Sequence, residues 1–131
     1  MISLEEFEEI VEEITVTLPE DFFRELHGGV IVREQAKLHP ASVDNDLFVM
    51  GEYHLDRYLG RFVVLYYGSF RACHGYLSRE MLREKIRKVI LHEFRHHLES
   101  LAGERDLEVE DAIEIAAYKE RKQSERAIDE Q

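Results

Sequence analysis

The chain has 131 residues, of which 44% are hydrophobic and 34% are charged, and its formal net charge is −11 at pH 7. This length and composition suit one globular domain with its own core. The negative charge argues against nucleic acid as a partner, because phosphate binding requires a basic patch. We expect no bilayer-spanning segment and no leader, because the sequence has no long apolar run and its first residues lead into acidic ones; Cys73 is the single cysteine. We therefore expect a cytoplasmic protein without membrane contact or an internal disulfide.

Two helices are predicted at the beginning of the chain. Ser3 and Glu6 have the spacing of a capping box, and the apolar residues of the segment 4–16 recur at helical spacing. This segment is predicted to be an amphipathic helix with an acidic outer face. Residues 19–26 begin with a proline at a first-turn position and end before two glycines, which predicts a short second helix.

Strands are predicted in the middle of the chain. Residues 30–32 are predicted to form a buried strand and residues 47–50 another, with a loop over residues 33–45 between them. Residues 61–67 consist of Arg61 followed by six apolar and aromatic residues and are bounded by glycines, which makes them the clearest strand. Residues 69–76 show no clear preference.

A long amphipathic helix is predicted over residues 79–102. Ser78 is a good N-cap, and Gly103 is expected to end the helix. The apolar residues form one stripe at helical spacing: Leu82, Ile86, Ile90, Phe94, Leu98 and Leu101. Asp106 is expected to cap a last helix, which the charged tail of about residues 119–131 continues as a solvated helix that frays.

The long helix carries His92-Glu93-Phe94-Arg95-His96, an HExxH motif. Histidines four residues apart project from the same face of a helix, close enough to bind one metal ion. Helical periodicity places both histidines away from the apolar stripe, with Glu93 between them and the core. Two histidine ligands and a glutamate as general base for a metal-activated water are typical of a zinc hydrolase.

A hydrolytic zinc site requires a third protein ligand. No histidine follows His97 in the sequence, which leaves an acidic residue after the long helix or an upstream histidine. We expect Asp106 to be this ligand, because the chain can fold back toward the histidines after the turn at Gly103, although Asp106 also suits a simple N-cap role. The acidic alternatives lie on the last helix: Glu110, Asp111 and Glu114.

The other histidines and the cysteine are expected to be structural. His97 is predicted to pack near the apolar stripe. Four histidines in loops or at strand ends are expected on the surface: His27, His39, His54 and His74. Tyr66 and Tyr67 are expected to be sheet residues, with the alternative that one donates a hydrogen bond to an oxyanion. Cys73 has no basic partner in the sequence pattern and is expected to be inert.

The sequences HEFRHHL at residues 92–98, GERD at residues 103–106 and LGRFVVLYYG at residues 59–68 resemble the small bacterial zincin-like metallopeptidases. The resemblance includes the acidic first helix and covers most of the chain. The family pattern is HExxHxxGxxD. This sequence has four extra residues between His96 and Gly103, about one helical turn, which keeps Glu110 as an alternative ligand.

The resemblance implies a single domain over residues 1–131 of the α+β class, with a small mixed β-sheet, an HExxH helix and flanking helices. It implies a zinc-dependent metallopeptidase that acts on a peptide or protein substrate. His92, His96 and Asp106 would bind Zn2+, and Glu93 would be the catalytic base. Residues 61–67 are the candidate edge strand for an extended peptide. Two alternatives are a non-catalytic protein-interaction module of the same fold and a metal-dependent hydrolase of another amide or ester.

Overall fold

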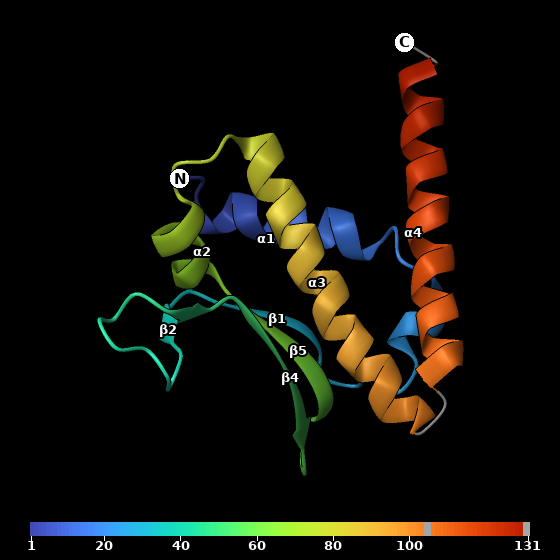
Figure 1. The fold of residues 1–131 in the computed structure, drawn as a ribbon, viewed down its shortest axis with the longest axis horizontal. Helices are drawn as coiled ribbons and strands as arrows, with labels where there is room; N and C mark the ends of the chain where they lie inside the picture. The colour runs from blue at the N-terminus through green and yellow to red at the C-terminus, as the bar shows by residue number, and fades with distance from the viewer. Residues whose placement is uncertain (104–105, 130–131) are drawn as a thin grey trace.

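The computed structural model describes the backbone of residues 1–103 and 106–129, and the side chains of residues 1–103, 113 and 115–126. Along the chain the elements are α1 (Leu4–Thr15), the 3-10 helix η1 (Glu20–Phe23), β1 (Gly29–Arg33), β2 (Lys37–Leu38), β3 (Phe48–Val49), β4 (Gly51–Asp56), β5 (Gly60–Tyr66), α2 (Tyr67–His74), α3 (Arg79–Ala102) and α4 (Asp106–Asp129). Helices and small sheets are combined in one α+β arrangement, as the sequence predicts (Figure 1).

The three-stranded sheet has the order β1-β5-β4, so β5 is the central strand. β1 pairs with β5 in parallel, with Gly29 opposite Phe62, and β4 pairs with β5 antiparallel. The prediction that residues 61–67 form an edge strand is therefore wrong. The physical reason is that β5 is buried on both faces over residues 62–66, which is characteristic of a central strand. The strand at the edge beside α3 is β4.

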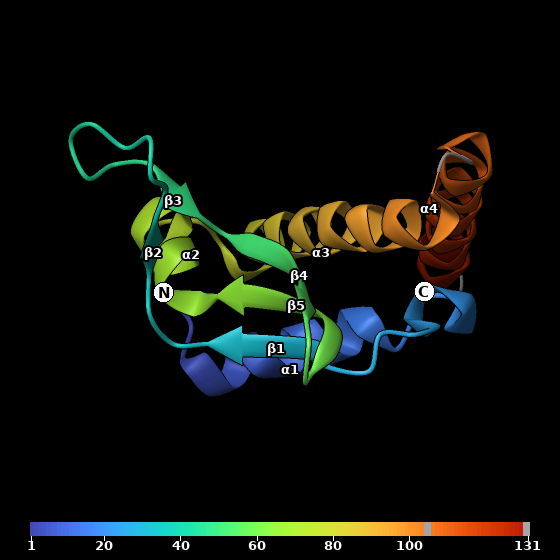
Figure 2. The same ribbon diagram turned by 90° about the horizontal axis from the view of Figure 1, so that it is seen from below.

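α1 and α3 lie on the same side of this sheet (Figures 1 and 2). Their apolar faces meet one face of β5 in a continuous core. The central members of this core, each with at most 1% of its surface exposed, are Phe7, Ile10, Ile14, Val63, Leu65, Phe70, Leu82, Ile86, Ile90 and Phe94. The predicted stripe of α3 is thus confirmed in its first four members, and this packing fixes the rotation of α3 about its axis.

The predicted N-caps of α1 and α3 and the predicted end of α3 are also confirmed. The Ser3 hydroxyl accepts a hydrogen bond from the Glu6 amide at 3.1 Å, and the Ser78 hydroxyl accepts one from the Met81 amide at 3.2 Å. Gly103 ends α3 with a φ of 63°, a conformation that glycine adopts at no steric cost. The chain then leaves α3, and α4 begins at Asp106.

Several predicted boundaries differ from the structure. Within residues 19–26 only a 3-10 turn forms, at Glu20–Phe23, and the predicted loop of residues 33–45 contains β2. The strand predicted over residues 47–50 is reduced to β3, which pairs antiparallel with β2 in a separate two-stranded sheet. Residues 69–76, which had no clear prediction, lie largely in α2.

α4 turns back along α3 and packs against it. Ala116 is buried against the core, and the Arg87 guanidinium donates to the Glu120 carboxylate at 2.6 Å. Residues 121–126 are exposed, so the predicted solvated continuation of the last helix is confirmed over these residues. No helix in the described part of the chain is long and apolar enough to span a membrane.

Candidate metal centre and groove

α3 presents the HExxH motif with its residues in different environments. His92 and His96 are exposed to solvent to a greater extent than Glu93, which is only 6% exposed. The prediction that Glu93 lies between the histidines and the core is therefore confirmed. This difference in exposure follows from the helical period. Ile90 and Phe94 are buried against the core, and Glu93 lies beside them on the side of α3 that faces the sheet.

The two histidine rings converge on one point. Their Nε2 atoms are 3.1 Å apart, and the ring planes lie at 89° to each other. Two nitrogens that are each about 2.0–2.1 Å from a tetrahedral zinc ion lie about 3.3 Å apart. The observed separation therefore fits chelation of one ion by His92 and His96 without a large side-chain movement.

The surroundings of the two imidazoles bear on their ability to bind a metal. Burial, followed by the charges of His96 and Arg95, lowers the pKa of His92, which favours the neutral ring. The Glu99 carboxylate lies 3.7 Å from Nδ1 of His96, and it also accepts a hydrogen bond from Arg95 at 2.9 Å. A carboxylate beside Nδ1 favours the tautomer with the proton on that nitrogen, which leaves Nε2 free to accept a metal.

The predicted third ligand is not among the side chains that the structure describes. The same holds for the three alternatives on α4: Glu110, Asp111 and Glu114. Among the described side chains, no group of three His, Cys, Asp or Glu residues has the arrangement of a metal site. Asp106 thus stays a prediction.

The course of α4 bears on these alternatives. Arg87, which binds Glu120 of α4, lies nine residues before His96. At about 100° per residue, nine residues correspond to about two and a half turns, so these two side chains leave α3 on opposite sides. The body of α4 therefore packs on the side of α3 that faces away from the histidines, and the ligand nearest to the helix-ending turn, Asp106, remains our first choice.

Glu93 has an altered acidity. Burial, followed by the negative charge of Glu52, raises the pKa of Glu93 to about 7. A carboxyl group with a pKa near the working pH is suited to accept and return a proton. In the described structure Glu93 shares its surroundings with both histidines, as a general base for a site at this position requires.

The histidines and Glu93 line an open groove of about 730 Å³ between α3 and the edge strand β4. β4 contributes Gly51, Glu52, Tyr53 and Leu55, and α3 contributes His92, Glu93, His96, Glu99 and Ser100. The role of β4 as the opposite wall was not predicted from the sequence. The alternation of polar and apolar residues from Glu52 to Asp56 is a period-two signal that would have found it.

His97 holds the two walls together beneath this groove. Its ring is fully buried, as expected for a packing residue, and Nε2 donates to the Arg24 carbonyl at 2.9 Å. Nδ1 then accepts from the Tyr53 hydroxyl at 2.8 Å, and Arg61 donates to that hydroxyl at 3.0 Å and also to Ser100. This chain of bonds ties α3 to β4 and β5, so it sets the position of the groove walls.

The predicted role of Tyr66 and Tyr67 is corrected in part. Tyr66 belongs to the sheet, but its hydroxyl donates to Glu52, whose carboxylate also binds Lys37 at 2.6 Å. Burial raises the pKa of Glu52, but the hydrogen bonds from Lys37 and Tyr66 outweigh it, so the net pKa is lowered. Tyr67 starts α2 and donates to the Ile2 carbonyl. Neither hydroxyl belongs to the groove lining, so the oxyanion alternative finds no support.

The surface assignment of the remaining histidines holds for His27 and His39, which are exposed. His54 is half-buried and stacks on Phe62, with ring centroids 5.1 Å apart. His74 is half-buried as well, and its Nδ1 has no hydrogen-bond partner among the described residues. Both depart from the prediction because they pack on apolar rings, His54 on Phe62 of the adjacent strand β5 and His74 on Phe70 one turn earlier in α2. Burial raises the pKa of the Cys73 thiol, as expected for an unreactive cysteine.

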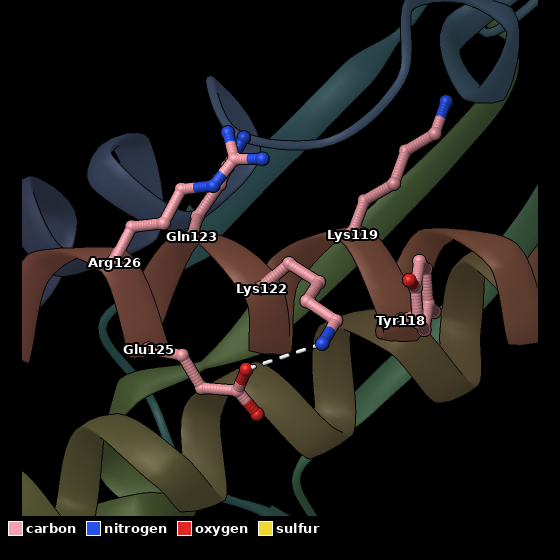
Figure 3. A pocket seen from close by; sticks show the side chains of 6 residues that line it. All are labelled: Tyr118, Lys119, Lys122, Gln123, Glu125 and Arg126. Atoms are coloured by element: carbon pink, nitrogen blue, oxygen red, sulfur yellow. Dashed lines mark hydrogen bonds and ion pairs between the residues drawn. The ribbon is translucent and has the colours of Figure 1, made fainter.

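Another depression lies on α4, away from the groove (Figure 3). It is lined by Tyr118, Lys119, Lys122, Gln123, Glu125 and Arg126. Lys122 and Glu125 form an ion pair at 3.4 Å, while the side chains of Lys119 and Arg126 point the other way. These exposed side chains of one helix do not converge, so we assign no site here.

Comparison with known proteins places the chain in a family. The solved structure of a conserved hypothetical protein from Thermo thermophilus matches with a TM-score of 0.66 and 38% sequence identity, over 77% of this chain and 98% of that chain. The chain belongs to the same family as that protein. No family model and no curated protein matches the sequence. The description of the related protein names no activity, so function is inferred from the groove.

Proposed function

We propose that this protein is a zinc-dependent metallopeptidase of the minimal zincin type. The observation that carries the proposal is the convergence of the His92 and His96 Nε2 atoms, 3.1 Å apart, beside the buried carboxyl group of Glu93. His92, His96 and the predicted Asp106 would hold the ion. Zinc bound there would supply a water of lowered pKa and would polarise the carbonyl of the substrate.

The proton transfers are assigned to Glu93. Burial raises its pKa to about 7 in the metal-free protein, and its carboxylate would accept a proton from water and return it to the leaving amine when the peptide bond breaks. The burial that raises the pKa of Glu93 also restricts the position of its side chain. Glu99 would orient the His96 ring from the outer side, and the hydrogen bond from His97 to the Arg24 carbonyl holds α3 in place next to it.

The substrate would lie along β4. In the described part of the chain β4 pairs with β5 alone, so its other edge is available to an added strand. Strand addition to a sheet edge is a common mode of peptide recognition, in which main-chain hydrogen bonds supply the affinity. Because β4 and α3 form opposite walls of one groove, a peptide on this edge passes His92, Glu93 and His96. This location favours a peptide over a small ester as the substrate.

Zinc content and peptide cleavage together test the proposal. Purified protein supplied with zinc is expected to bind one ion per chain, measured by elemental analysis after dialysis. His92→Ala and His96→Ala are expected to lose it, whereas His27→Ala, an exposed histidine outside the groove, keeps it. Glu93→Gln is expected to retain zinc and to lose cleavage of a peptide library.

The outcomes separate this proposal from its alternatives. Absence of stoichiometric zinc in the wild-type protein, with both histidine variants indistinguishable from it, overturns the proposal. Stoichiometric zinc without any peptide cleavage favours the non-catalytic interaction module. Hydrolysis of a small ester or another amide by a zinc-loaded protein that cuts no peptide favours a different hydrolase.

A further inference from the structure

A second groove lies between α1 and β1, apart from the candidate metal centre. It is here called the α1–β1 groove, and it has a volume of about 440 Å³. One wall comes from α1 between residues 8 and 15, the other from β1 between residues 29 and 32, and η1 contributes Phe23 (Figure 2). None of these residues lines the groove that contains the HExxH motif. A ligand in the α1–β1 groove would therefore leave the candidate metal centre open.

β1 is the edge strand of the three-stranded sheet next to this groove. Over the described residues β1 pairs with β5 alone, so its other side has no strand partner. The backbone N–H and C=O groups of such an edge can pair with an additional strand. Beside this edge, the half-buried Val30 and Val32 form an apolar floor together with Val11 and Phe23. An added strand would cover this floor.

The rim of the α1–β1 groove is acidic. Glu8 and Glu12 are exposed on α1, and the lining contains no lysine or arginine. Glu13 of the same helix pairs with Arg83 at 2.6 Å, whereas Glu8 and Glu12 form no ion pair with any side chain that the structure describes. The two carboxylates are thus available to a cationic ligand.

The spacing of the two glutamates matches that of an extended chain. Residues four apart on a helix differ by about 6 Å along its axis. Every second residue of a strand points to the same face, and such residues lie about 6.6 to 6.8 Å apart. A strand added to β1 would therefore place two side chains of one face opposite Glu8 and Glu12. Arginine and lysine suit these positions, because their apolar stems can lie on the valine floor while the charged groups reach the carboxylates.

We infer that the α1–β1 groove binds a basic, extended segment of a partner protein as an added strand, with arginine or lysine at alternate positions opposite Glu8 and Glu12. A second copy of this chain suits the site poorly, because pairing through β1 would bring two acidic α1 helices together on proteins of net charge −11. The inference does not depend on the proposed peptidase function, since the two grooves share no lining residue.

Equilibrium binding of synthetic peptides tests the inference. The wild-type protein, kept metal-free with EDTA, is titrated with a fluorescein-labelled octapeptide in which arginine and threonine alternate, because threonine favours an extended backbone. Fluorescence anisotropy at about 0.15 M salt, where the Debye length is about 8 Å, limits the contribution of distant charges. Binding is expected to be saturable, with one peptide per chain.

Two further peptides separate strand addition from simple charge attraction. In the first, arginine pairs alternate with threonine pairs, so that the composition is unchanged but no two arginines are two positions apart. It is expected to bind about fivefold more weakly, because only one of the two ion pairs can form. In the second, the threonines of the alternating peptide are N-methylated. It is expected to lose about tenfold or more, because main-chain hydrogen bonds to β1 are removed.

Two double variants locate the binding site. Glu8→Gln with Glu12→Gln is expected to weaken binding of the alternating peptide by about fivefold or more. Glu5→Gln with Glu9→Gln is the matched control, because these residues have the same spacing and exposure on α1 but do not line the groove. It removes the same charge and is expected to change the affinity by less than about twofold. Circular dichroism confirms that each variant is folded.

Three results would overturn the inference. The first is absence of binding of the alternating peptide up to millimolar concentration. The second is equal affinity for the three peptides, or equal losses in the two double variants, either of which would reduce the interaction to unspecific attraction by an acidic helix. The third is a wild-type dimer in sedimentation velocity that the alternating peptide dissociates, which would assign the edge of β1 to a second copy of the chain.

Discussion

The groove face and the core face of α3 place histidine in opposite environments. His92 and His96 reach the solvent, and their Nε2 atoms point toward each other. His97, the next residue, is fully buried, and each of its ring nitrogens has a hydrogen-bond partner in another element of the fold. The side chains of His96 and His97 differ by a rotation of about 100° about the helix axis. This rotation places the His96 ring where a ligand can reach it and the His97 ring within the hydrogen bonds of the core.

A histidine is a ligand candidate when a nitrogen lone pair remains available, and the two faces differ in this respect. In His97 the Nε2–H group donates to the Arg24 carbonyl, and Nδ1 accepts from the Tyr53 hydroxyl. Both nitrogens of the neutral ring are therefore engaged, and neither can bind a metal. In His96 the contact with Glu99 concerns Nδ1 and leaves Nε2 directed at His92. Changes on the two faces should therefore affect different properties.

The largest effect on stability is expected from His97→Ala. The change removes two hydrogen bonds, leaves Tyr53 and the Arg24 carbonyl without their partner and opens a cavity, at a cost of about 3 to 4 kcal/mol in the free energy of unfolding. His96→Ala, on an exposed position, is expected to change this free energy by about 0.5 kcal/mol or less in metal-free protein. Urea denaturation in the presence of EDTA measures both.

Zinc binding should reverse the order of these two variants. His96→Ala is expected to lose zinc completely, while His97→Ala at a temperature where it remains folded keeps a measurable affinity. Equal losses of stability in the two variants would show that the two faces of α3 do not differ in the way that their burial indicates.

The next effect is the pH dependence of the free energy of unfolding that arises from Glu93, which lies between the groove face and the core face of α3. In the unfolded chain Glu93 ionises near 4.5, whereas in the folded protein its pKa is about 7. The folded state therefore favours the protonated carboxyl, and the free energy of unfolding falls by about 3 kcal/mol as the pH rises from 4.5 to 7. Glu93→Gln removes this penalty, so the variant should be more stable than the wild type at high pH.

The stability advantage of Glu93→Gln is expected to be near zero below pH 4.5, to grow between pH 4.5 and 7 and then to level off. Denaturation of the metal-free proteins at about pH 4, 6 and 8 follows this course. Asp44→Asn, at an exposed loop position, is the control for loss of one negative charge. An advantage that is the same at all three pH values would contradict the raised pKa.

The helices of this protein were predictable because their determinants are local. Ser3 and Ser78 mark the starts of α1 and α3, and Gly103 marks the end of α3 by a backbone conformation that glycine favours. The apolar stripe of α3 then fixes which face is buried. These signals placed the HExxH motif and predicted correctly that Glu93 is nearer to the core than the histidines.

The arrangement of the sheet was not predictable in the same way. β5 is central because β1, which precedes it by about 30 residues, pairs with it in parallel, and a local pattern contains no information on that partner. The edge strand is β4, and its polar residues kept it from being predicted as a strand. The opposite wall of the groove was therefore found only in the structure.

A smaller effect is expected from Tyr53→Phe, which removes one hydroxyl from the connection between α3 and β4. The buried Nδ1 of His97 and the guanidinium of Arg61 would lose a partner, at a cost of about 1 to 2 kcal/mol in the free energy of unfolding. Tyr58→Phe is the matched control, because Tyr58 is 91% exposed. Thermal denaturation of both variants measures the difference, and equal midpoints would exclude a structural role for the Tyr53 hydroxyl.

The smallest effect on the free energy of unfolding is expected from Glu99→Gln. This variant tests whether a carboxylate on the groove face of α3 contributes to metal binding. Glu99 pairs with Arg95 on the surface of α3, and an exposed pair of this kind contributes about 0.5 kcal/mol or less. Its contact with Nδ1 of His96 predicts a second, separate effect, because a weaker orientation of that ring should lower the affinity for zinc by about tenfold or more. Competition with a chromophoric chelator measures this affinity. A variant with unchanged zinc affinity would mean that helix geometry alone orients His96, so the carboxylate beside Nδ1 would belong to the surface of α3 and not to the metal centre.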